Sequence, residues 1–346
     1  MESHTSSLRA SCCALFVAAL LACPLAVSAA DDALDVLGFR NHHPFLQIFG
    51  VPTFQSAELA SKGRLKFDIN AELTNHADSG GDTNELFVID GETYAFNASL
   101  RHRLWQRLEV GIDLPVVAHQ EGFLDNVIKE WHDVLGVSNS NRAGPKDQLQ
   151  FLYEVGGVTQ YEITSSTSGL GDIQLTAAMP LKEATAGDGS ALTIRTSLKL
   201  PTGDEEKLHG SGATDFSAGL YGSTRTKLFD RDLGLTGFIG LLALGDGDVL
   251  PDIQESTVTF GGVAAKWQAM ERLGIIVQVY AQGGYFETDV EELGGDTFQL
   301  GIGLDYHLPN QGLTLALAIA EDPLSDATPD FAIQFSVRSS NRRSTP

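Results

Sequence analysis

The sequence lacks the features that hold most secreted domains and helical membrane proteins together. Its 346 residues contain three cysteines, all of them within the first 30 positions, so the rest of the chain can form no disulfide. No run of about 18 apolar residues follows the N-terminus, which excludes a bundle of transmembrane helices. Basic residues are also scarce, because 23 Lys and Arg stand against 45 Asp and Glu, a net charge of −22. Such an acidic balance argues against nucleic acid as a partner.

Residues 1–30 have the organisation of a secretory signal peptide. Arg9 precedes an apolar stretch that runs from Cys12 to Ala22, and Ser28-Ala29-Ala30 supplies the small residues of a cleavage site. Cleavage there leaves a mature chain without cysteine. The alternative is a lipoprotein-type cut that would leave Cys23 lipidated, and Pro24 directly after this cysteine disfavours it.

What the sequence has in abundance is alternation of apolar and polar residues. The stretch 171–201 contains two alternating runs separated by the turn-forming residues AGDG, and 64–75 alternates as cleanly. Such strands have one apolar and one polar face, and about 9–11 tilted residues cross the hydrocarbon of a membrane. Because the pattern recurs along the chain, we predict an all-β fold, an antiparallel transmembrane β-barrel.

The connections predict the number of strands and the orientation of the barrel. Short turns such as 105–108 and 229–232 alternate with longer acidic loops such as 287–296, as in outer-membrane barrels whose short turns are periplasmic. A Gly156-Gly157 hairpin within 148–164 would raise the strand count to fourteen if it joined the wall. A soluble β-sandwich or lipocalin-like barrel would share the alternation of apolar and polar residues, but not this alternation of short turns and long loops. The twelve expected strands are 64–75, 93–105, 108–117, 171–182, 191–201, 214–228, 233–244, 255–267, 273–285, 296–308, 312–321 and 330–338.

The segments outside the expected wall are less regular. With the barrel at 63–338, residues 31–62 form either a periplasmic N-terminal segment or a plug folded into the lumen, and 339–346 form a C-terminal tail. Apolar residues at helical spacing predict an amphipathic helix at 124–135, within a long external loop. Polar loop residues are expected at 76–85. Aromatic residues near strand ends, where rings favour the membrane interface, are Trp105, Trp267, Tyr285 and Tyr306.

In a barrel the polar face is the lumen, and here it carries charges of both signs. These charges either cross-link the wall through charge-assisted hydrogen bonds or shape a polar pore. The lumen-facing candidates are Arg64, Lys66, Asp68, Glu72, Arg101, Arg103, Asp113, Arg195 and Lys199.

No pattern of residues predicts catalysis, a cofactor or a metal site. The sequence has no GxSxG motif and no His/Glu pair at zinc spacing, and neither His76 nor His132 lies with its neighbouring serine on a lipid-facing strand. We therefore expect that the protein is not an enzyme. The expected partners are outer-membrane lipid and lipopolysaccharide, bridged by divalent cations at acidic loops, and the barrel assembly machinery.

Several short stretches resemble the bacterial domain-of-unknown-function family 3187, and the order in which they follow one another along the chain makes the match specific. The resemblance spans about 35–338 and implies an envelope location and a barrel-like fold, but no activity and no site residues. One departure is that many outer-membrane barrels end on a phenylalanine read by the assembly machinery, whereas Phe335 is followed by SVRSSNRRSTP. The matching stretches are RNHHPF (40–45), DGET (90–93), FLDNVIKEWH (123–132), SGLGD (168–172) and EDPLSDATPDF (321–331).

Together these features predict a barrel in the Gram-negative outer membrane that serves as a passive conduit or binding barrel for a small molecule. KLPTGD (199–204) and SGLGD are also similar to turns of outer-membrane transport barrels, which favours transport. Two alternatives stay open. A structural envelope barrel would have a filled lumen and pass nothing. A lipid-modifying outer-membrane enzyme would need a His–Ser pair that meets lipid.

Overall fold

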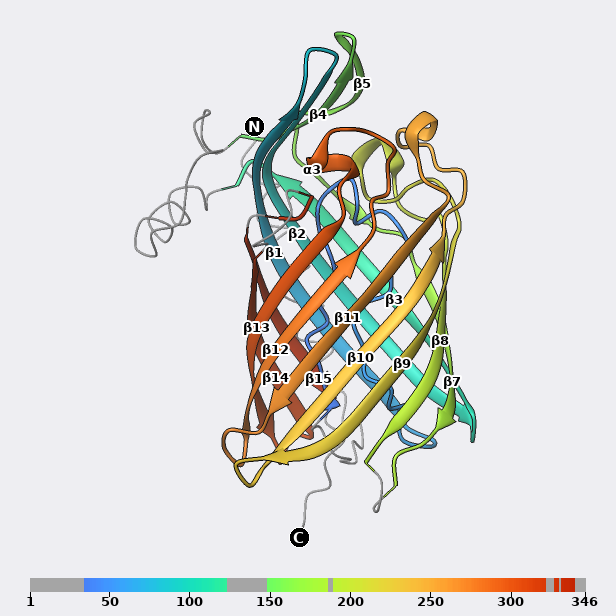
Figure 1. The fold of residues 1–346 in the computed structure, drawn as a ribbon, viewed down its shortest axis with the longest axis vertical. Coiled ribbons are helices and arrows are strands. Elements are labelled where there is room, and N and C mark those ends of the chain that lie inside the picture. Colours follow the sequence, from blue (N-terminus) through green and yellow to red (C-terminus); the bar gives the residue numbers. More distant parts are fainter. Residues whose placement is uncertain (1–33, 123–147, 186–188, 322–326, 330, 340–346) are drawn as a thin grey trace, which may run out of the picture.

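The chain folds into a closed antiparallel β-barrel with three additional strands at one end (Figure 1). The structure is a computed structural model that describes residues 34–122, 148–185, 189–321, 327–329 and 331–339. The wall closes because β1 pairs with β2 along one edge and with β15 along the other. The predicted twelve-stranded barrel is confirmed. Its wall strands are β1 (Leu65–Gly81), β2 (Glu85–Trp105), β3 (Leu108–Gln120), β7 (Gln174–Lys182), β8 (Ala191–Lys199), β9 (Asp215–Leu228), β10 (Arg231–Ala243), β11 (Thr257–Trp267), β12 (Leu273–Gln282), β13 (Thr297–Leu308), β14 (Leu313–Glu321) and β15 (Phe331–Ser339).

The three additional strands do not enter the wall. The hairpin of β4 (Gln150–Val155) and β5 (Val158–Ile163) turns at the predicted glycine pair, and β4 adds to the upper part of β2. The short strand β6 (Thr167–Leu170) pairs with the end of β3. The count of wall strands therefore stays at twelve, and the alternative of fourteen is wrong.

The first long connection is a strand extension and not the loop that its polar residues suggested. β1 and β2 continue as a paired ladder from His76↔Gly91 to Gly81↔Leu86, and Asp82 accepts hydrogen bonds from the backbone N–H groups that follow it in the turn. This ladder satisfies the backbone polar groups beyond the membrane belt. Its polar side chains tolerate water there, so the apolar alternation that marks a membrane strand is not needed.

Little helix is present in the part of the chain that the structure describes. The external loops contain two 3-10 turns, Glu205–Lys207 and Pro251–Ile253, and one short helix, α3 (Glu291–Gly294). None of the described helices has the length and apolar character needed to cross a membrane. The predicted helix at 124–135 lies outside the described residues, as do the signal segment and residues 340–346.

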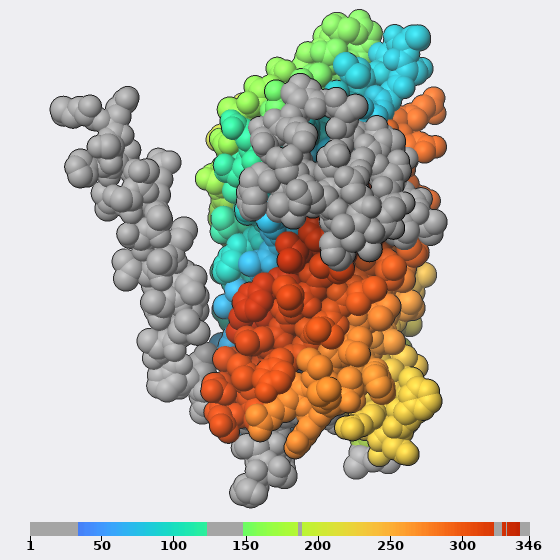
Figure 2. Space-filling view, turned by 90° about the vertical axis from the view of Figure 1, so that its left-hand side faces the viewer, coloured from blue at the N-terminus to red at the C-terminus, as the bar shows by residue number. Residues whose placement is uncertain are grey.

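The outer surface of the wall carries the apolar face of each strand. On β13 the outward Ile302 and Leu304 are about half exposed, whereas the alternate residues Gln299 and Asp305 are buried. Cross-strand partners share a face, so that Ile302 lies beside Ile319 of β14. In the space-filling view the C-terminal strands form a continuous outer surface (Figure 2). This apolar belt matches the lipid-facing surface expected of a membrane barrel.

Aromatic residues mark the end of the barrel that carries the short turns. Trp105 is 69% exposed, and Phe229, in the two-residue turn between β9 and β10, is 81% exposed. Tyr285 contradicts the interfacial placement that we predicted for it. β12 ends before it, and the tyrosine turns inward, where it is 1% exposed and stacks on Phe49.

The plugged lumen as the candidate functional site

The lumen contains the N-terminal segment 34–62, called here the plug. It has almost no secondary structure beyond a turn near residues 44–48, yet most of its side chains are buried, Leu37 and Phe45 completely. Its blue trace runs inside the wall in Figure 1. Because the plug has no ladder of its own, its backbone N–H and C=O groups need partners from the wall.

The first limb of the plug, 34–41, lies in a groove of small residues. Leu37 and Phe39 pack where β13 presents glycine: a Cβ added to Gly301 would lie 3.0 Å from the Phe39 ring, and one added to Gly303 would lie 3.0 Å from Leu37 Cδ1. Gln278 of β12 accepts a hydrogen bond from the Leu37 N–H at 3.0 Å. The groove is completed by Ile276, Ala316, Ala318, Ala320 and Ala332.

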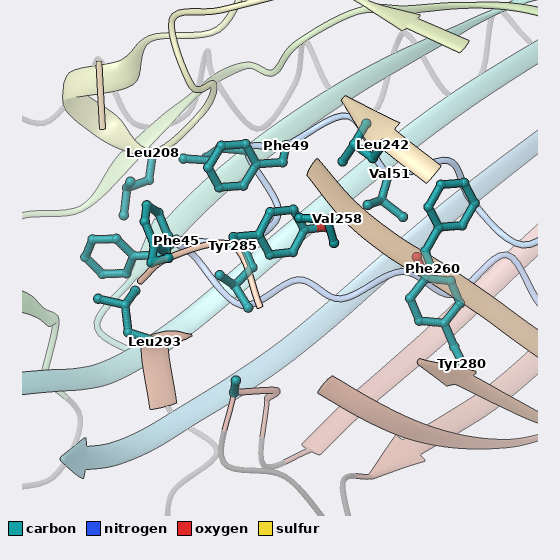
Figure 3. Close-up of a cluster of buried hydrophobic side chains, with 14 of the residues drawn as sticks. Phe45, Phe49, Val51, Leu208, Leu242, Val258, Phe260, Tyr280, Tyr285 and Leu293 are labelled. Carbon is teal, nitrogen blue, oxygen red and sulfur yellow. The ribbon is translucent and has the colours of Figure 1, made fainter. Parts of the chain in front are cut away.

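The apex of the plug packs under the external loops through aromatic contacts. Phe45 makes edge contacts with Phe87 of β2 and Tyr161 of β5, with ring centroids 5.5 and 5.4 Å apart. Phe49 stacks on Tyr285 at 4.7 Å with the rings 8° from parallel. Figure 3 shows Phe45, Phe49 and Tyr285 together with Leu208 and Leu293 from the loops. The apex is thus part of the apolar cluster at the end of the barrel that carries the long loops.

The second limb, 50–62, returns along a row of rings that we call the aromatic arc. Phe54 contacts Phe238 at 4.5 Å, and Phe238 stacks in turn on Tyr221 at 4.9 Å. Glycines on the neighbouring strands are covered by these rings, since a Cβ on Gly240 would lie 2.4 Å from the Phe260 ring. The arc takes one residue from each of four consecutive strands: Tyr221 (β9), Phe238 (β10), Phe260 (β11) and Tyr280 (β12).

Charged side chains of β3, β8 and β9, next to the aromatic arc, bind the plug. Arg195 donates to the carbonyls of Ser56 and Glu58, both at 2.9 Å from Nη2, and pairs with Glu109 at 3.0 Å. Glu109 in turn accepts a hydrogen bond from the Ala60 N–H at 2.5 Å. Arg225 reaches the plug by a side-chain pair with Glu58 at 2.6 Å. Charge-assisted hydrogen bonds of this kind are stronger than neutral ones.

Lys199 is the most buried of these anchors. Its Nζ lies 2.8 Å from Asp172 and 3.1 Å from Asp215, and it donates to the Ile48 carbonyl at 3.0 Å. Asp215 also accepts the Gly50 N–H at 2.9 Å. A Cβ on Gly50 would lie 2.9 Å from the Asp215 Cβ, so only glycine lets the plug approach this closely. The cluster holds the plug where the apex meets the second limb.

The nine charged residues predicted from the sequence divide into three groups. Lys66, Glu72, Arg195 and Lys199 contact the plug, the first two through Asp35 at 3.4 Å and His42 at 3.7 Å. Arg101 pairs with Asp113 across two wall strands at 2.8 Å, and Arg103 pairs with Glu183 at 2.6 Å near the short-turn end. Arg64, just before β1, and Asp68 of β1 are partly buried in the wall.

Sequence reasoning missed the plug residues that complete these contacts. Asp172 and Asp215 fall on the polar face of two predicted strands, although Asp172 lies just before the observed start of β7. Asp35 and His42 belong to the irregular plug, where no periodicity could mark them, and their wall partners lie about 30 residues further along the chain.

A cavity of about 30 Å³ remains between the plug and the wall. On the wall side it touches one continuous arc, made of β15, β1, β2, β3, β8 and the start of β7, which we call the polar arc. Its lining includes Arg40, His42 and Gln47 of the plug and Asn70, Glu72 and Gln334 of the wall. No group of three or more metal-ligating side chains occurs among the described residues.

The catalytic pairs considered from the sequence do not form a lipid-facing site in the part that is described. His76 is 2% exposed and turns to the lumen side, where its Nε2 lies 3.1 Å from the Thr74 hydroxyl. Ser79 is exposed near the hairpin turn. His132 and Ser138 lie outside the described residues.

An apolar outer belt around a closed barrel with a polar, plugged lumen defines an outer-membrane-type β-barrel protein. The chain belongs to the family described as "Protein of unknown function (DUF3187)", whose profile matches residues 13–340. No curated protein matches the chain.

Solved outer-membrane barrels are similar in fold at low sequence identity. The COG4313 outer membrane channel from Pseudomonas putida F1 is 12% identical with a TM-score of 0.51, and the alignment covers 82% of this chain and 97% of that one. The NanC porin is 7% identical with a TM-score of 0.42, over 78% and 98% of the chains. The Pseudomonas putida toluene transporter TodX is 8% identical with a TM-score of 0.37, over 88% and 98%. At these identities the likeness concerns the fold alone.

Proposed function

We propose that this protein is an outer-membrane channel or binding barrel for a small molecule, closed at rest by its own plug. The observation that carries the proposal is the cavity between the plug and the polar arc, because it places charged and amide side chains along the lumen. The apolar belt and the predicted signal segment support an outer-membrane location. The fold shared with the COG4313 outer membrane channel, over 97% of that chain, also favours a channel.

A second candidate is a structural barrel whose lumen passes nothing. The packing of the plug on both sides favours it, and a cavity of about 30 Å³ has no room for an organic solute while the plug stays in place. The two candidates differ in one respect, which is whether the plug moves. Among the described residues no arrangement favours the lipid-modifying enzyme. Lipopolysaccharide and the barrel assembly machinery stay predicted partners.

An engineered disulfide that joins the plug to the wall, and that reductant can break, tests the proposal. The mature chain expected from the sequence has no cysteine, so no native thiol can form a disulfide with an engineered pair. Ala57 of the plug and Ser223 of β9 are suitable, because the Ala57 N–H donates to the Ser223 Oγ at 2.9 Å. The variant A57C/S223C is reconstituted in planar bilayers and in liposomes, with each single cysteine variant as control.

A channel with a movable plug gives openings in the reduced variant and in wild type, and loses them when the disulfide forms. Reductant then restores them. Liposome swelling in small sugars or amino acids should follow the same pattern. A barrel that stays silent in wild type, in the reduced variant and in both controls would instead support the structural candidate. Unchanged conductance in the oxidised variant would show that solutes do not need plug movement.

A further inference from the structure

Two arginines on neighbouring strands of the wall meet the plug at one place. Arg195 of β8 donates from Nη2 to the carbonyl oxygens of Ser56 and Glu58, both at 2.9 Å. Arg225 of β9 pairs with the Glu58 carboxylate at 2.6 Å. In these contacts the plug presents oxygen atoms, one of them from a carboxylate, to two guanidinium groups. Arginine is suited to this role because its planar fork of N–H donors matches the oxygens of a carboxylate.

Aromatic rings adjoin these arginines. The guanidinium carbon of Arg195 lies 5.8 Å from the centroid of the Tyr221 ring. Tyr221 stacks on Phe238 at 4.9 Å, with the two rings 7° from parallel, and the Phe54 ring of the plug packs on Phe238 at 4.5 Å. The wall therefore places a cationic contact next to an apolar ring contact. We call these four wall residues, Arg195, Arg225, Tyr221 and Phe238, the arginine–ring site.

Both rings of the arginine–ring site lie over glycines of the wall. A Cβ added to Gly262, the cross-strand partner of Phe238, would lie 2.8 Å from the Phe238 ring. One added to Gly219 would lie 3.0 Å from the Tyr221 ring. Because the glycines leave room for them, the rings lie along the wall, and the Phe54 ring can pack against them from the lumen. Aromatic rings pair favourably in such tilted or offset arrangements.

The channel or binding function proposed above, on which this inference rests, requires that the plug moves. The site then loses the Phe54 ring and the oxygens of Ser56 and Glu58 together, and polar groups left without partners are costly. A solute with a carboxylate and an apolar ring supplies both kinds of contact. We propose that the arginine–ring site binds a small amphipathic anion, a carboxylate with an apolar ring. In the closed state Phe54 and Glu58 occupy the site in its place.

Neighbouring charges limit the class of ligand further. Glu109 pairs with Nη1 of Arg195 at 3.0 Å, which holds the guanidinium group against the wall while its Nη2 is directed at the plug. Lys199, further along β8, is paired with Asp172 and Asp215 within the wall, so we do not include it in the site. Two arginines repel a cationic ligand. A solute without charge would leave the guanidinium groups without the ionic contact that Glu58 now makes.

A ligand of this class competes with the plug. It can bind only when residues 54–58 have left the arginine–ring site, so by mass action it stabilises the arrangement in which the plug is displaced. The solute should therefore promote opening of its own channel. This effect distinguishes a binding site from arginines that only anchor the plug, because an anchor gives no response to added solute.

Single-channel recording of the full-length protein in planar bilayers tests the site, with sodium benzoate as the probe. Benzoate should raise the open probability several-fold, whereas benzyl alcohol, which has the ring without the charge, and acetate, which has the charge without the ring, should have much weaker effects at the same concentration. Arg225→Gln should abolish the response to benzoate. Lys227→Gln, which removes an exposed charge from the same strand, is the matched control and should respond like wild type.

Two further variants separate the parts of the site. Phe238→Leu keeps an apolar side chain but removes the ring, and it should reduce the preference for benzoate over acetate. Glu58→Gln removes the carboxylate with which the plug occupies the site, so benzoate should act at a lower concentration, by a factor of up to about five. A concentration dependence unchanged by Glu58→Gln would contradict competition between benzoate and the plug.

The outcomes distinguish this inference from the proposed function. Channels that open but respond equally to all three solutes, or an Arg225→Gln variant that responds like wild type, would overturn the arginine–ring site and leave the channel in place. A barrel that binds without conducting should still show faster maleimide labelling of Ala57→Cys in the plug when benzoate is added. Silent channels together with unchanged labelling would overturn both the proposed function and the site.

Discussion

Two sets of wall residues hold the same plug in different ways. Along the aromatic arc the plug contributes side chains, such as Phe54 against Phe238, and the contact is apolar. Along the polar arc and the neighbouring strands it contributes backbone, and charged wall residues such as Arg195 and Lys199 reach its carbonyls. The cavity touches the wall only along the polar arc.

This difference has a physical reason. Apolar contacts are non-directional, so rings can shift until they fill the available space. Hydrogen bonds require particular distances and angles, and a wall that must satisfy an irregular backbone at fixed points leaves gaps between those points. The charged lumen of this barrel therefore does not resemble a water-filled pore. Much of its charge serves to pair the polar groups of a segment without secondary structure.

Removing the central cation of the polar contacts should have the largest effect. Lys199→Met leaves Asp172 and Asp215 buried beside each other without their lysine, which we expect to cost about 3–5 kcal/mol of unfolding free energy. Urea unfolding of the protein in lipid vesicles measures it. Adding Asp172→Asn and Asp215→Asn to the same chain should recover part of the loss. A midpoint equal to wild type would mean that these charges do not hold the plug.

The apolar contact can be broken at Phe54. Phe54→Ala should cost about 3–5 kcal/mol, towards the lower end because an irregular segment can relax into the space. A double-mutant cycle with Phe238→Ala should show a coupling of about 0.5–1.5 kcal/mol between the two rings. Leu241→Ala, on the lipid-facing side of the same strand β10, serves as the control and should change little. Strictly additive effects at Phe54 and Phe238 would contradict the contact.

Filling the groove of the first limb tests whether the wall is shaped for the plug. Gly301→Val adds a side chain whose Cβ alone would lie 3.0 Å from the Phe39 ring. Overpacking of this kind costs about 1–3 kcal/mol of unfolding free energy. Single-channel recordings should show more openings as the limb is displaced. Gly237→Ala is the matched control, because the nearest atom to its added Cβ is 3.5 Å away. If both variants behave like wild type, the limb does not depend on the groove.

The smallest effect is expected where a charge contact is partly exposed to solvent. Glu58 and Arg225 pair at 2.6 Å, but a quarter of each side chain is accessible. Glu58→Gln should therefore cost only about 0.2–1 kcal/mol, and less at high salt. Urea midpoints at low and high NaCl measure the difference. A loss as large as that of Lys199→Met would mean that burial does not separate the two kinds of polar contact.

The wall was largely predictable from the sequence. The prediction is wrong only where a residue does not face lipid, because there the side-chain pattern does not depend on contact with the membrane. The extension of β1 beyond Asn75 carries polar residues and glycines because it stands outside the apolar belt. Tyr285 was expected at the interface from its position near a strand end, but the loop after β12 carries it inward to Phe49. In both places tertiary context, and not periodicity, selected the environment.

The candidate site was predictable only in its wall half. Alternation assigned Glu72, Arg195 and Lys199 to the polar face, but it could not say whether they line a pore or bind another segment. Their partners Ile48, Ser56 and His42 lie in a stretch without a period. No local rule relates such a stretch to wall residues that follow it by about 30 positions, as Glu72 follows His42, or by more than a hundred, as Arg195 follows Ser56.

The sequence by itself predicted the barrel and the two faces of its strands and favoured twelve strands, because side chains alternate between the faces of a strand every two residues, a pattern that neighbouring residues already show. Only the tertiary structure decided that residues 34–62 fill the lumen. That decision depends on contacts such as Gly50 with Asp215 and Val36 with Arg338, which join positions 165 and 302 residues apart. A lumen exists only once the sheet has closed, so the partners of the plug cannot be read from any one part of the chain.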